Sequence, residues 1–371
     1  MESNLKLGKI WGIPVGLHLS WFIIFGLLTW SLASGYFPRA YPQLSSAAHW
    51  VLGAITSLLF AGSVLAHELG HAFVALRNRI PVRGITLFIF GGVAQVEQEP
   101  RSPGAEFRIA IAGPLVSLGL ALAFGCLWLL DRSLPLLAAP SEYLMRINLI
   151  LAIFNMIPGF PLDGGRVLRA LVWWRTRSFQ RATQVAVSGG QLVALGFIGL
   201  GVFTIFNGRF FDGLWLAFIG WFLQNAAAST MASTKLQSIL QDVKVAQVMS
   251  TDCVRIPSLT PLNRVVEDQI LTGGNRCFFV SDNGPPNGIL TLQDITSIPQ
   301  AKWRYMTSYQ AMRPLERLVN VDPETDVLAA LLQMDNAKVA QLPVVQNEEL
   351  VGVVSREQVL HYLRTRLELG V

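Results

Sequence analysis

The sequence of 371 residues is 52% hydrophobic and only 14% charged, with a formal net charge of +5. A soluble domain carries about 25% charged residues, so this composition excludes an ordinary soluble protein and predicts a membrane protein with a soluble part. Its basic residues form no stripe interleaved with aromatic residues, so we expect no nucleic-acid partner. The cysteines are far apart and lack CxxC spacing, which predicts neither a disulfide framework nor a thiolate zinc site; they are Cys126, Cys253 and Cys277.

Long apolar runs fill the first part of the chain, and each is close to the ~20 residues that a helix needs to cross the hydrocarbon core. They cover residues 13–33, 49–76, 106–130, 143–160, 183–206 and 211–230. The first run is too long for a signal-peptide core, so we expect it to be retained as a span. We predict a multi-pass α-helical membrane domain of about six transmembrane helices over residues 1–232.

Lysine and arginine are unevenly divided between the expected loops. With six spans both termini lie on one side, and most basic residues fall there, whereas the opposite loops hold only Arg39, Arg132 and Arg209. The positive-inside rule then predicts an integral membrane protein with both termini and the C-terminal domain in the cytoplasm.

The second run carries the motif "HELGH", which comprises His67, Glu68 and His71. A charged residue at the bilayer centre costs about 2.5–3.5 kcal/mol on insertion scales, so it usually has a function. The two histidines are four residues apart and share a helix face, so both can bind one metal ion, while Glu68 can act on a water as general base. Zinc is the usual metal for this spacing. The alternative is a pair of histidines hydrogen-bonded within a helix bundle.

A catalytic zinc usually takes three protein ligands, and Asp163 in "PLDGGR" is the best candidate for the third. It lies at the expected cytoplasmic end of the fourth span, at a depth similar to that of HELGH. Proline and glycine interrupt the chain there, and such breaks are tolerated at membrane depth where they line a cavity or are buried in protein. The alternative for Asp163 is a helix cap at the interface.

"HELGH" in one apolar segment and "FNMIPGFPLDGGR" in a later one resemble the site-2 protease family of intramembrane zinc metalloproteases. The resemblance covers the first ~230 residues. It implies that His67, His71 and Asp163 hold one Zn²⁺ per chain and that Glu68 is the general base. It also implies regulated intramembrane proteolysis, in which the substrate is a transmembrane segment of another protein. In bacteria the family commonly cleaves membrane-bound anti-sigma factors or pro-sigma factors.

The same resemblance makes Asn155 a polar residue beside the active site. Its amide can donate a hydrogen bond to the oxyanion or to the substrate backbone, and an interhelical hydrogen bond is the equal alternative. We expect a structural role for Asn148, and we assign no chemistry to His18 in the first span.

The segment "RGITLFIFGGVAQVEQEP" between the second and third spans is rich in β-branched and aromatic residues. We expect a membrane-associated strand or hairpin there. Its edge can pair with an unwound substrate by strand addition, or the segment can be a loop that only shields the site.

The soluble part contains an internal repeat with a period of about 63 residues, in which Met249 matches Met312 and Gly288 matches Gly352. Each unit reads as strand, helix, two strands and helix. The repeat resembles a tandem pair of CBS domains, which predicts a cytoplasmic α/β CBS-pair domain with repeats at residues 244–300 and 306–365.

CBS pairs often form a cleft for adenine nucleotides (ATP, ADP or AMP), and in the family pattern a hydroxyl and a helix N-terminus suit phosphate while an acid suits ribose. The first repeat has the full pattern in Gly288, Thr291 and Asp294. The second has Ser355, but Gln358 replaces the acid. The alternative is a dimerisation module without a ligand, and we expect a homodimer through these domains in either case.

Two other classes of function fit parts of the sequence. CBS pairs also occur on channels and transporters, and a protease-like chain can be an inactive scaffold. The histidines at i and i+4 with an adjoining glutamate disfavour an ion path, and the intact Glu68 disfavours a scaffold.

Overall fold

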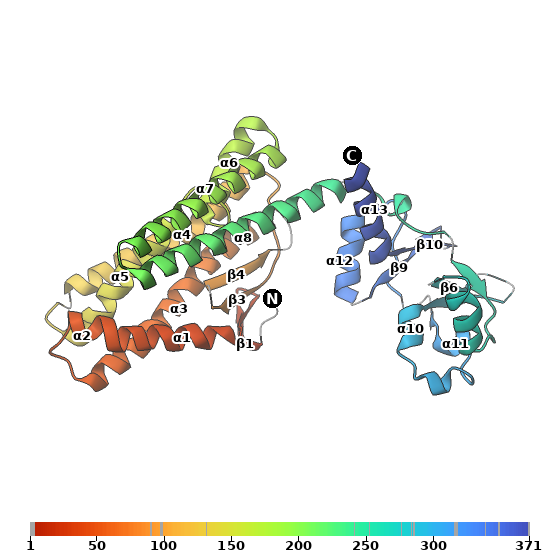
Figure 1. Ribbon diagram of the computed structural model, residues 1–371, viewed down its shortest axis with the longest axis horizontal. Helices are drawn as coiled ribbons and strands as arrows, with labels where there is room; N and C mark the ends of the chain where they lie inside the picture. The colour runs from red at the N-terminus through yellow and green to blue at the C-terminus, as the bar shows by residue number, and fades with distance from the viewer. Residues whose placement is uncertain are drawn as a thin grey trace. The chain divides into compact units, whose positions relative to one another are not determined.

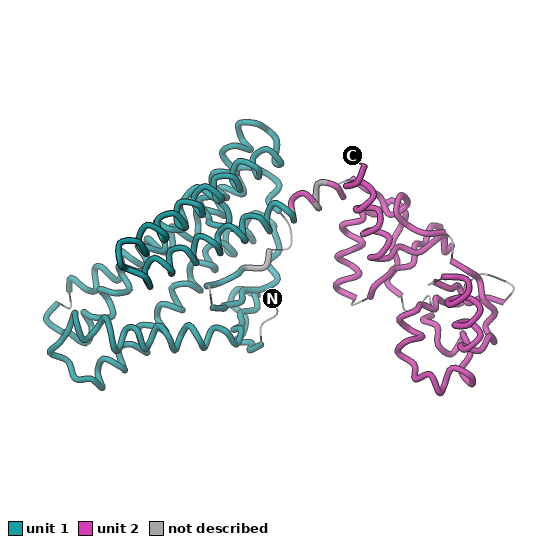
Figure 2. Tube along the Cα trace, viewed as in Figure 1, with its two compact units in different colours: residues 1–232 teal, residues 233–371 magenta. Residues whose placement is uncertain are grey.

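The computed structural model describes residues 4–89, 91–96, 99–130, 132–240, 242–251, 253–275, 277–282, 284, 286–314, 318–337, 339–347 and 349–369. Contacts divide the chain into two compact units, Met1–Ala232 and Ser233–Val371 (Figure 2). Each unit is described by itself.

The first unit is a bundle of long helices with a small sheet beside it (Figure 1). Among the described residues, five helical segments are long and apolar enough to cross a membrane. They are Ser20–Ala40 (α1 Ser20–Ser31, η1 Leu32–Tyr36 and α2 Phe37–Ala40), α3 (Ser46–Arg77), α4 (Pro103–Leu130), α5 (Pro135–Asn155) and α7 (Phe179–Phe206). The sixth apolar run lies in one continuous helix, α8 (Phe210–Leu240). The count of six spans remains a prediction.

The predicted start of the first span is wrong. Residues Ile13–Leu17 form a strand, β2, and α1 begins only at Ser20. The strand pairs with β1 (Leu5–Ile10) through a two-residue turn in which Trp11 and Gly12 both have positive φ, a conformation that matches the twist of a hairpin. The sequence did not indicate the boundary between the strand and the helix, because hydropathy alone does not distinguish a buried strand from a helix.

His18 therefore precedes the first span and does not lie within it. Its backbone N–H donates to the Leu87 carbonyl, and its Nδ1 is 2.8 Å from Ser20 Oγ. These contacts join the start of α1 to the sheet, so the described role of His18 is structural.

The sheet has four strands in the order β1-β2-β3-β4, where β3 is Val82–Phe88 and β4 is Gly91–Val96. β2 and β3 are parallel, and the other neighbours are antiparallel. The expected strand or hairpin is present as the β3–β4 pair, and its association with the membrane surface remains a prediction. The sheet packs on α3 through Ile13, Ile85 and Ala72, so it lies directly beside the helix that carries HELGH.

Helix α4 contacts α3, α5 and α6 (Asp163–Thr176), and α6 contacts α7. Small residues allow α7 and α8 to approach closely, as is common for helices in membranes. A Cβ atom built at Gly213 would lie 2.4 Å from the Gly201 carbonyl oxygen, and one at Gly220 would lie 2.6 Å from the Ala194 carbonyl oxygen.

A buried ion pair ties α6 to α4. Arg169 Nε donates to Glu106 Oε1 at 2.6 Å, and the two side chains are almost fully enclosed. Arg169 also reaches Glu99, just before α4, at 3.1 Å, and its guanidinium lies over the rings of Phe160 and Phe179. The buried charge of Arg169 is tolerated among these apolar helices because carboxylates pair with it.

The second unit consists of two repeats of the same plan. The first contains β5 (Val254–Ile256), α9 with η3 (Leu262–Arg264 and Val265–Leu271), β6 (Cys277–Val280), β7 (Gly288–Thr291) and α10 (Leu292–Thr296). The second contains α12 (Val327–Ala337), β9 (Gln341–Gln346), β10 (Glu349–Ser355) and α13 (Arg356–Leu369). Short elements lie between and before them: η2 (Val245–Gln247), η4 (Gln300–Lys302), α11 (Ser308–Ala311) and β8 (Arg313–Pro314).

The first residues of each repeat pair with the other repeat. Ser250, which precedes β5 in the first repeat, bridges to Val353 in the second, and β8, which precedes α12 in the second, pairs with β7 of the first. A Cβ atom at Gly288 would lie 2.7 Å from Met312 Sδ, and one at Gly352 would lie 3.3 Å from Met249 Sδ. The methionine and glycine matches in the sequence thus correspond to the same contact in each half of the unit. In both, a strand glycine packs against the segment that contains the matched methionine, and a larger residue would not leave room for that segment.

The cysteine spacing predicts no disulfide framework, and the structure contains one disulfide that the spacing does not indicate. Cys253 and Cys277 form a disulfide with a Cα–Cα distance of 5.2 Å, although they are 24 residues apart in sequence. They precede β5 and begin β6, which are neighbouring parallel strands, so the fold brings together what the spacing separates. Cys126, in α4, is a free thiol.

Candidate metal centre and nucleotide cleft

Three side chains from two distant helices converge inside the first unit. His67 and His71 project from α3, and Asp163 is the first residue of α6. His67 Nε2 and His71 Nε2 are 3.1 Å apart, and Asp163 Oδ2 is 3.1 Å from the first and 3.2 Å from the second. All three are shielded from solvent, since the side chains of the two histidines and Asp163 are 5%, 8% and 14% exposed.

The spacing of these atoms suits a zinc ion. Ligands at about 2.0–2.1 Å in a tetrahedral arrangement are roughly 3.3 Å from one another, and the three observed separations are 3.1–3.2 Å. The triangle is therefore one face of a tetrahedron of the right size.

The protonation pattern also favours a cation. The second ring nitrogen of His71, Nδ1, is 2.6 Å from the Ile109 carbonyl oxygen, which can only accept, so Nδ1 carries the hydrogen. In the neutral ring, Nε2 then presents a lone pair toward the other histidine and the carboxylate. Electron-rich atoms facing one another in a buried site call for a positive charge between them.

Helix α4 supplies the partners that hold the histidines. His67 Nδ1 lies 2.8 Å from the fully buried Ser117 Oγ, which can accept its hydrogen in the way the Ile109 carbonyl does for His71. Between them, Gly113 lies against the metal-binding atoms, where a Cβ would be 2.2 Å from His71 Nε2 and 2.6 Å from His67 Nε2. One face of α4 thus orients both rings and leaves room for an ion.

Sequence reasoning missed these three residues of α4. The available signal was the spacing of Ile109, Gly113 and Ser117, which recur every four residues in an apolar run and so share one helix face. A backbone carbonyl that accepts a hydrogen bond cannot be predicted from the side chain of its residue, but the small glycine and the buried hydroxyl could have indicated this face.

Glu68 projects from α3 one residue after His67 and is half-buried. Strand β4 passes beside it, since a Cβ atom at Gly92 would lie 2.5 Å from Glu68 Cγ. Among the described strands, β4 is at one edge of the sheet. The glutamate therefore lies against an edge strand, on the helix that carries both histidines.

The two asparagines of α5 lie in different surroundings. Asn155 is the last residue of the helix and half-buried, and no side-chain hydrogen bond is found for it within the described structure. Asn148 is fully buried and donates to Ser63 Oγ at 3.2 Å and to the Leu144 carbonyl at 2.9 Å. Asn148 thus joins α5 to α3, in agreement with the structural role expected for it.

In the second unit, Thr291 and Asp294 make a capping box at the start of α10. The Thr291 hydroxyl donates to Asp294 Oδ2 at 2.6 Å, and the Asp294 N–H donates to Thr291 Oγ1 at 3.2 Å. Arg313 Nε donates to the other carboxylate oxygen at 2.5 Å. Both oxygens expected to bind ribose therefore have partners within the chain.

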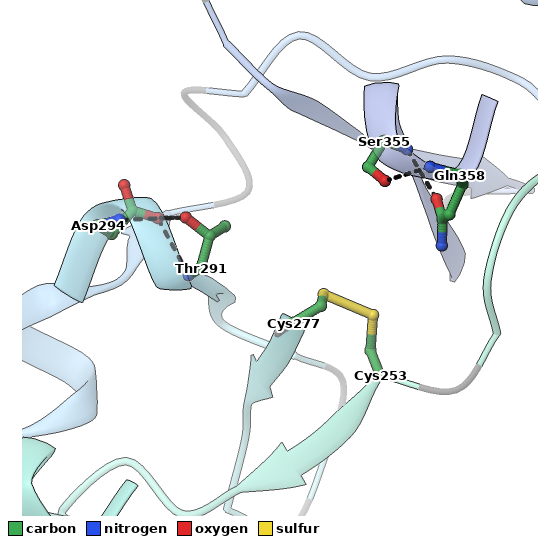
Figure 3. Close-up of a disulfide and its surroundings, with 6 residues drawn as sticks. All are labelled: Cys253, Cys277, Thr291, Asp294, Ser355 and Gln358. Carbon is green, nitrogen blue, oxygen red and sulfur yellow. Dashed lines mark hydrogen bonds between the residues drawn. A yellow bond between two sulfur atoms is a disulfide. The ribbon is translucent and has the colours of Figure 1, made fainter. Parts of the chain in front are cut away.

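The second repeat repeats this cap at α13, where the Ser355 N–H donates to Gln358 Oε1 at 2.7 Å and the Gln358 N–H donates to Ser355 Oγ at 3.2 Å. Glutamine replaces aspartate without loss of the cap. Gly288 lies against Met312 and Arg313, and this contact accounts for its lack of a side chain. Figure 3 shows the two caps on either side of the disulfide.

Two hollows adjoin these residues. One, beside Thr291, Arg313 and Leu342, has a volume of about 20 Å³, enough for about one water molecule. A neighbouring one of about 430 Å³ has the size of a small-molecule site, and its lining includes Met312, Arg313, Leu318, Val319, Ala337 and Gln341.

Comparison with known proteins gives two family matches. The model described as Peptidase family M50 matches residues 55–134 and 131–197, and the model described as CBS domain matches residues 309–365. The first match includes the histidines of α3 and Asp163.

Relatives extend along the whole chain. A Synechocystis protein named "Putative zinc metalloprotease sll0528" is 34% identical over 98% of this chain and 97% of its own length. Rip3 of Mycobacterium tuberculosis, which carries the same description, is 32% identical over 97% and 92%. Zinc metalloprotease MJ0392 of Methanocaldococcus jannaschii is 28% identical over 97% and 96%. A solved structure, "Site-2 Protease from Methanocaldococcus jannaschii", is 29% identical, covers 61% of this chain and 94% of that one, and has a TM-score of 0.41.

Proposed function

Because the chain belongs to peptidase family M50, the site-2 protease family of zinc metalloproteases, we propose that it hydrolyses peptide bonds within transmembrane segments of other proteins. The observation that carries this proposal is the triangle of His67, His71 and Asp163, buried among helices long enough to cross a membrane. A protease whose metal-binding atoms lie inside such a bundle is suited to substrates that are themselves in the bilayer.

The proposed ligands of the ion are the two histidine Nε2 atoms and the Asp163 carboxylate, with Ser117 and the Ile109 carbonyl as their hydrogen-bond partners. When bound there, zinc supplies Lewis-acid chemistry to the scissile carbonyl and to the attacking water.

Glu68 is the proposed general base. It adjoins the ligand His67 on α3, takes a proton from the attacking water, and delivers a proton to the leaving amine. Asn155 is proposed to donate a hydrogen bond to the oxyanion or to the substrate backbone, and the absence of a side-chain hydrogen bond for it among the described residues supports this over an interhelical bond.

Strand β4 is the proposed binding edge for substrate. A transmembrane helix hides its carbonyls in internal hydrogen bonds, so the segment to be cut must first become extended. An extended segment added along β4 would pass beside Glu68, because Gly92 of that strand lies against the glutamate side chain. Membrane-bound anti-sigma or pro-sigma factors are candidate substrates on the family resemblance alone.

The proposed setting is the bacterial inner membrane with both termini in the cytoplasm, since basic residues concentrate in loops on that side. A cysteine at the exposed Gln43 should react with an impermeant thiol reagent added outside cells, and one at the exposed Gln180 should not, in a background lacking the native cysteines. The reverse labelling would overturn the orientation.

The second unit, with proposed repeats 244–300 and 306–365, is the proposed regulatory part. We propose that the pocket beside Arg313 binds an adenine nucleotide. On binding, the ion pair between Arg313 and Asp294 would open, so that Arg313 binds phosphate and Asp294 accepts from the ribose hydroxyls. Titration of the full-length protein with ATP, ADP and AMP by calorimetry tests this. Heat that is lost in Asp294→Ala supports it, and no heat with any nucleotide favours a dimerisation module, whose homodimer would appear in the mass measured by light scattering.

The proposed activity is tested by the position of the cut. Purified protein reconstituted in liposomes should cleave a transmembrane test substrate at a bond inside its apolar segment, as mapped by mass spectrometry of the fragments. Cleavage only in the flanking polar segments would contradict intramembrane proteolysis while leaving the metalloprotease class intact.

A further inference from the structure

We propose that Cys253 and Cys277 are a reversible dithiol–disulfide pair, a redox modification site built into the second unit between its two repeats. The proposal does not depend on the proteolytic function, because it concerns only the thiol chemistry of this unit.

The register of two strands brings the sulfurs together. β5 and β6 are parallel, with Val254 opposite Phe278 and Arg255 opposite Phe279. The cysteines occupy the preceding position on each strand, and their Cα–Cα distance of 5.2 Å lies within the range of ~4.4–6.8 Å for disulfides. The backbone therefore presents a preformed pair that needs no rearrangement to close.

Their setting favours reversible chemistry over a permanent cross-link. The sequence has three cysteines, and the remaining one, Cys126, is in α4 of the other unit. This step rests on the cytoplasmic location proposed above for the second unit, where disulfides are usually transient or redox-sensing because the compartment keeps thiols reduced. Both cysteines are only half-buried, so a small soluble thiol can reach them.

The pair lies where its state affects both repeats. Cys277 is opposite Thr291 on its other side, so Cys253, Cys277 and Thr291 form one row across three strands with side chains on the same face. Two positions along, Phe279 and Ile289 continue this face.

On that face the sulfurs pack into a cluster that includes Val353 and Leu350 of the second repeat. The same row begins α10, whose cap is Thr291 with Asp294 (Figure 3). Reduction of the disulfide therefore changes an apolar contact between the two repeats. It also changes the packing beside Thr291, the residue that caps α10.

The reaction is thiol–disulfide exchange with a soluble dithiol. One thiolate attacks a sulfur of the pair, the S–S bond breaks, and the other cysteine leaves as thiolate and takes a proton. The second thiol of the reductant then resolves the mixed disulfide. Two electrons and two protons pass to the protein, and the reductant becomes a disulfide.

The test uses the full-length protein in detergent with mixtures of reduced and oxidised dithiothreitol. After equilibration, free thiols are alkylated with N-ethylmaleimide, and peptides are measured by mass spectrometry. Cys253 and Cys277 should change together from blocked to alkylated as the reduced fraction rises, while Cys126, a free thiol outside the pair, should be alkylated to the same extent in every mixture.

The proposal is overturned if either cysteine is alkylated in the most oxidising mixture, if both stay blocked in the most reducing one while the protein is folded, or if they change independently. A second measurement, hydrogen exchange of the segment Gly288–Thr296, tests the effect on the cleft. Reduction should cause loss of amide protection there in the wild type and no redox-dependent change in Cys253→Ser/Cys277→Ser. Equal exchange in both states of the wild type would remove the regulatory role.

Discussion

At the scale of single residues, the geometry of the proposed metal centre depends on the hydrogen-bond partners of its ligands. Two histidines at i and i+4 are readable from the sequence, but their rings are oriented by Ser117 and by the Ile109 carbonyl on another helix. Partners of this kind fix the tautomer and the direction of the lone pairs, and their loss typically costs 10–100-fold in metal affinity.

Ser117→Ala is therefore expected to weaken zinc binding by about 10–100-fold without removing a ligand. Competition with a zinc chelator of known affinity measures the change in purified protein. Ser57→Ala, a substitution of another buried serine of the same unit, is the control. Equal zinc affinity in the wild type and Ser117→Ala would show that this hydroxyl does not position His67.

The small size of Gly113 gives a sharper comparison. Gly113→Ala puts a methyl group into the space between the two Nε2 atoms, so zinc occupancy should fall to near zero. Gly119→Ala on the same helix meets nothing within 4 Å and should keep its zinc. Elemental analysis of both variants decides, and full occupancy in Gly113→Ala would contradict the position of the site.

At the scale of elements, the sequence predicts helices well and strand boundaries poorly. Apolar length predicted the long helices of the first unit, because a helix in lipid must satisfy its own backbone. The strand Ile13–Leu17 was absorbed into the first span, because its five residues are apolar on both faces and adjoin α1. The link from α6 to α4 through Arg169 and Glu106 was also beyond the sequence, since it depends on how helices far apart in the chain meet.

Strand β4 is expected to control the position of Glu68. In Gly92→Ala the new methyl would lie 2.5 Å from Glu68 Cγ, so the glutamate must move. We expect at least about a tenfold loss in cleavage with unchanged zinc content, because general-base catalysis depends on position. Gly62→Ala, on the helix that carries Glu68 and in open space, is the matched control. Wild-type cleavage by Gly92→Ala would separate β4 from the active site.

The buried ion pair should matter for stability. Removing Glu106 leaves Arg169 only its contact with the half-exposed Glu99, so Glu106→Gln should destabilise the first unit by about 3–5 kcal/mol. The double variant Glu106→Leu/Arg169→Met, which leaves no charge unpaired between these two positions, should recover part of the loss. Thermal unfolding of detergent-purified protein compares them. A double variant less stable than Glu106→Gln would show that the pair contributes more than mutual neutralisation.

At the scale of the whole molecule, the sequence predicts a membrane unit and a second unit, and the contacts of the structure divide the chain at the same place. The motif predicts that Thr291 and Asp294 receive a nucleotide, which remains a prediction, and in the structure the two residues cap α10 while Asp294 also accepts from Arg313. The sequence alone does not separate the two interpretations, because a hydroxyl followed three residues later by an acid is also a capping box. The disulfide escaped prediction for a similar reason, since strand pairing and not spacing joins its cysteines.

The central claim is that His67, His71 and Asp163 hold zinc and that Glu68 performs the proton transfers. The most direct measurement is zinc content and cleavage of a transmembrane test substrate, made on the same preparations of Glu68→Gln, Asp163→Ala and a control, His49→Ala, which changes another buried histidine of α3. Glu68→Gln should keep about one zinc per chain and lose at least about 100-fold in cleavage. Asp163→Ala should lose both, and His49→Ala neither. Cleavage at the wild-type rate by Glu68→Gln, or full zinc content in Asp163→Ala, would contradict the account.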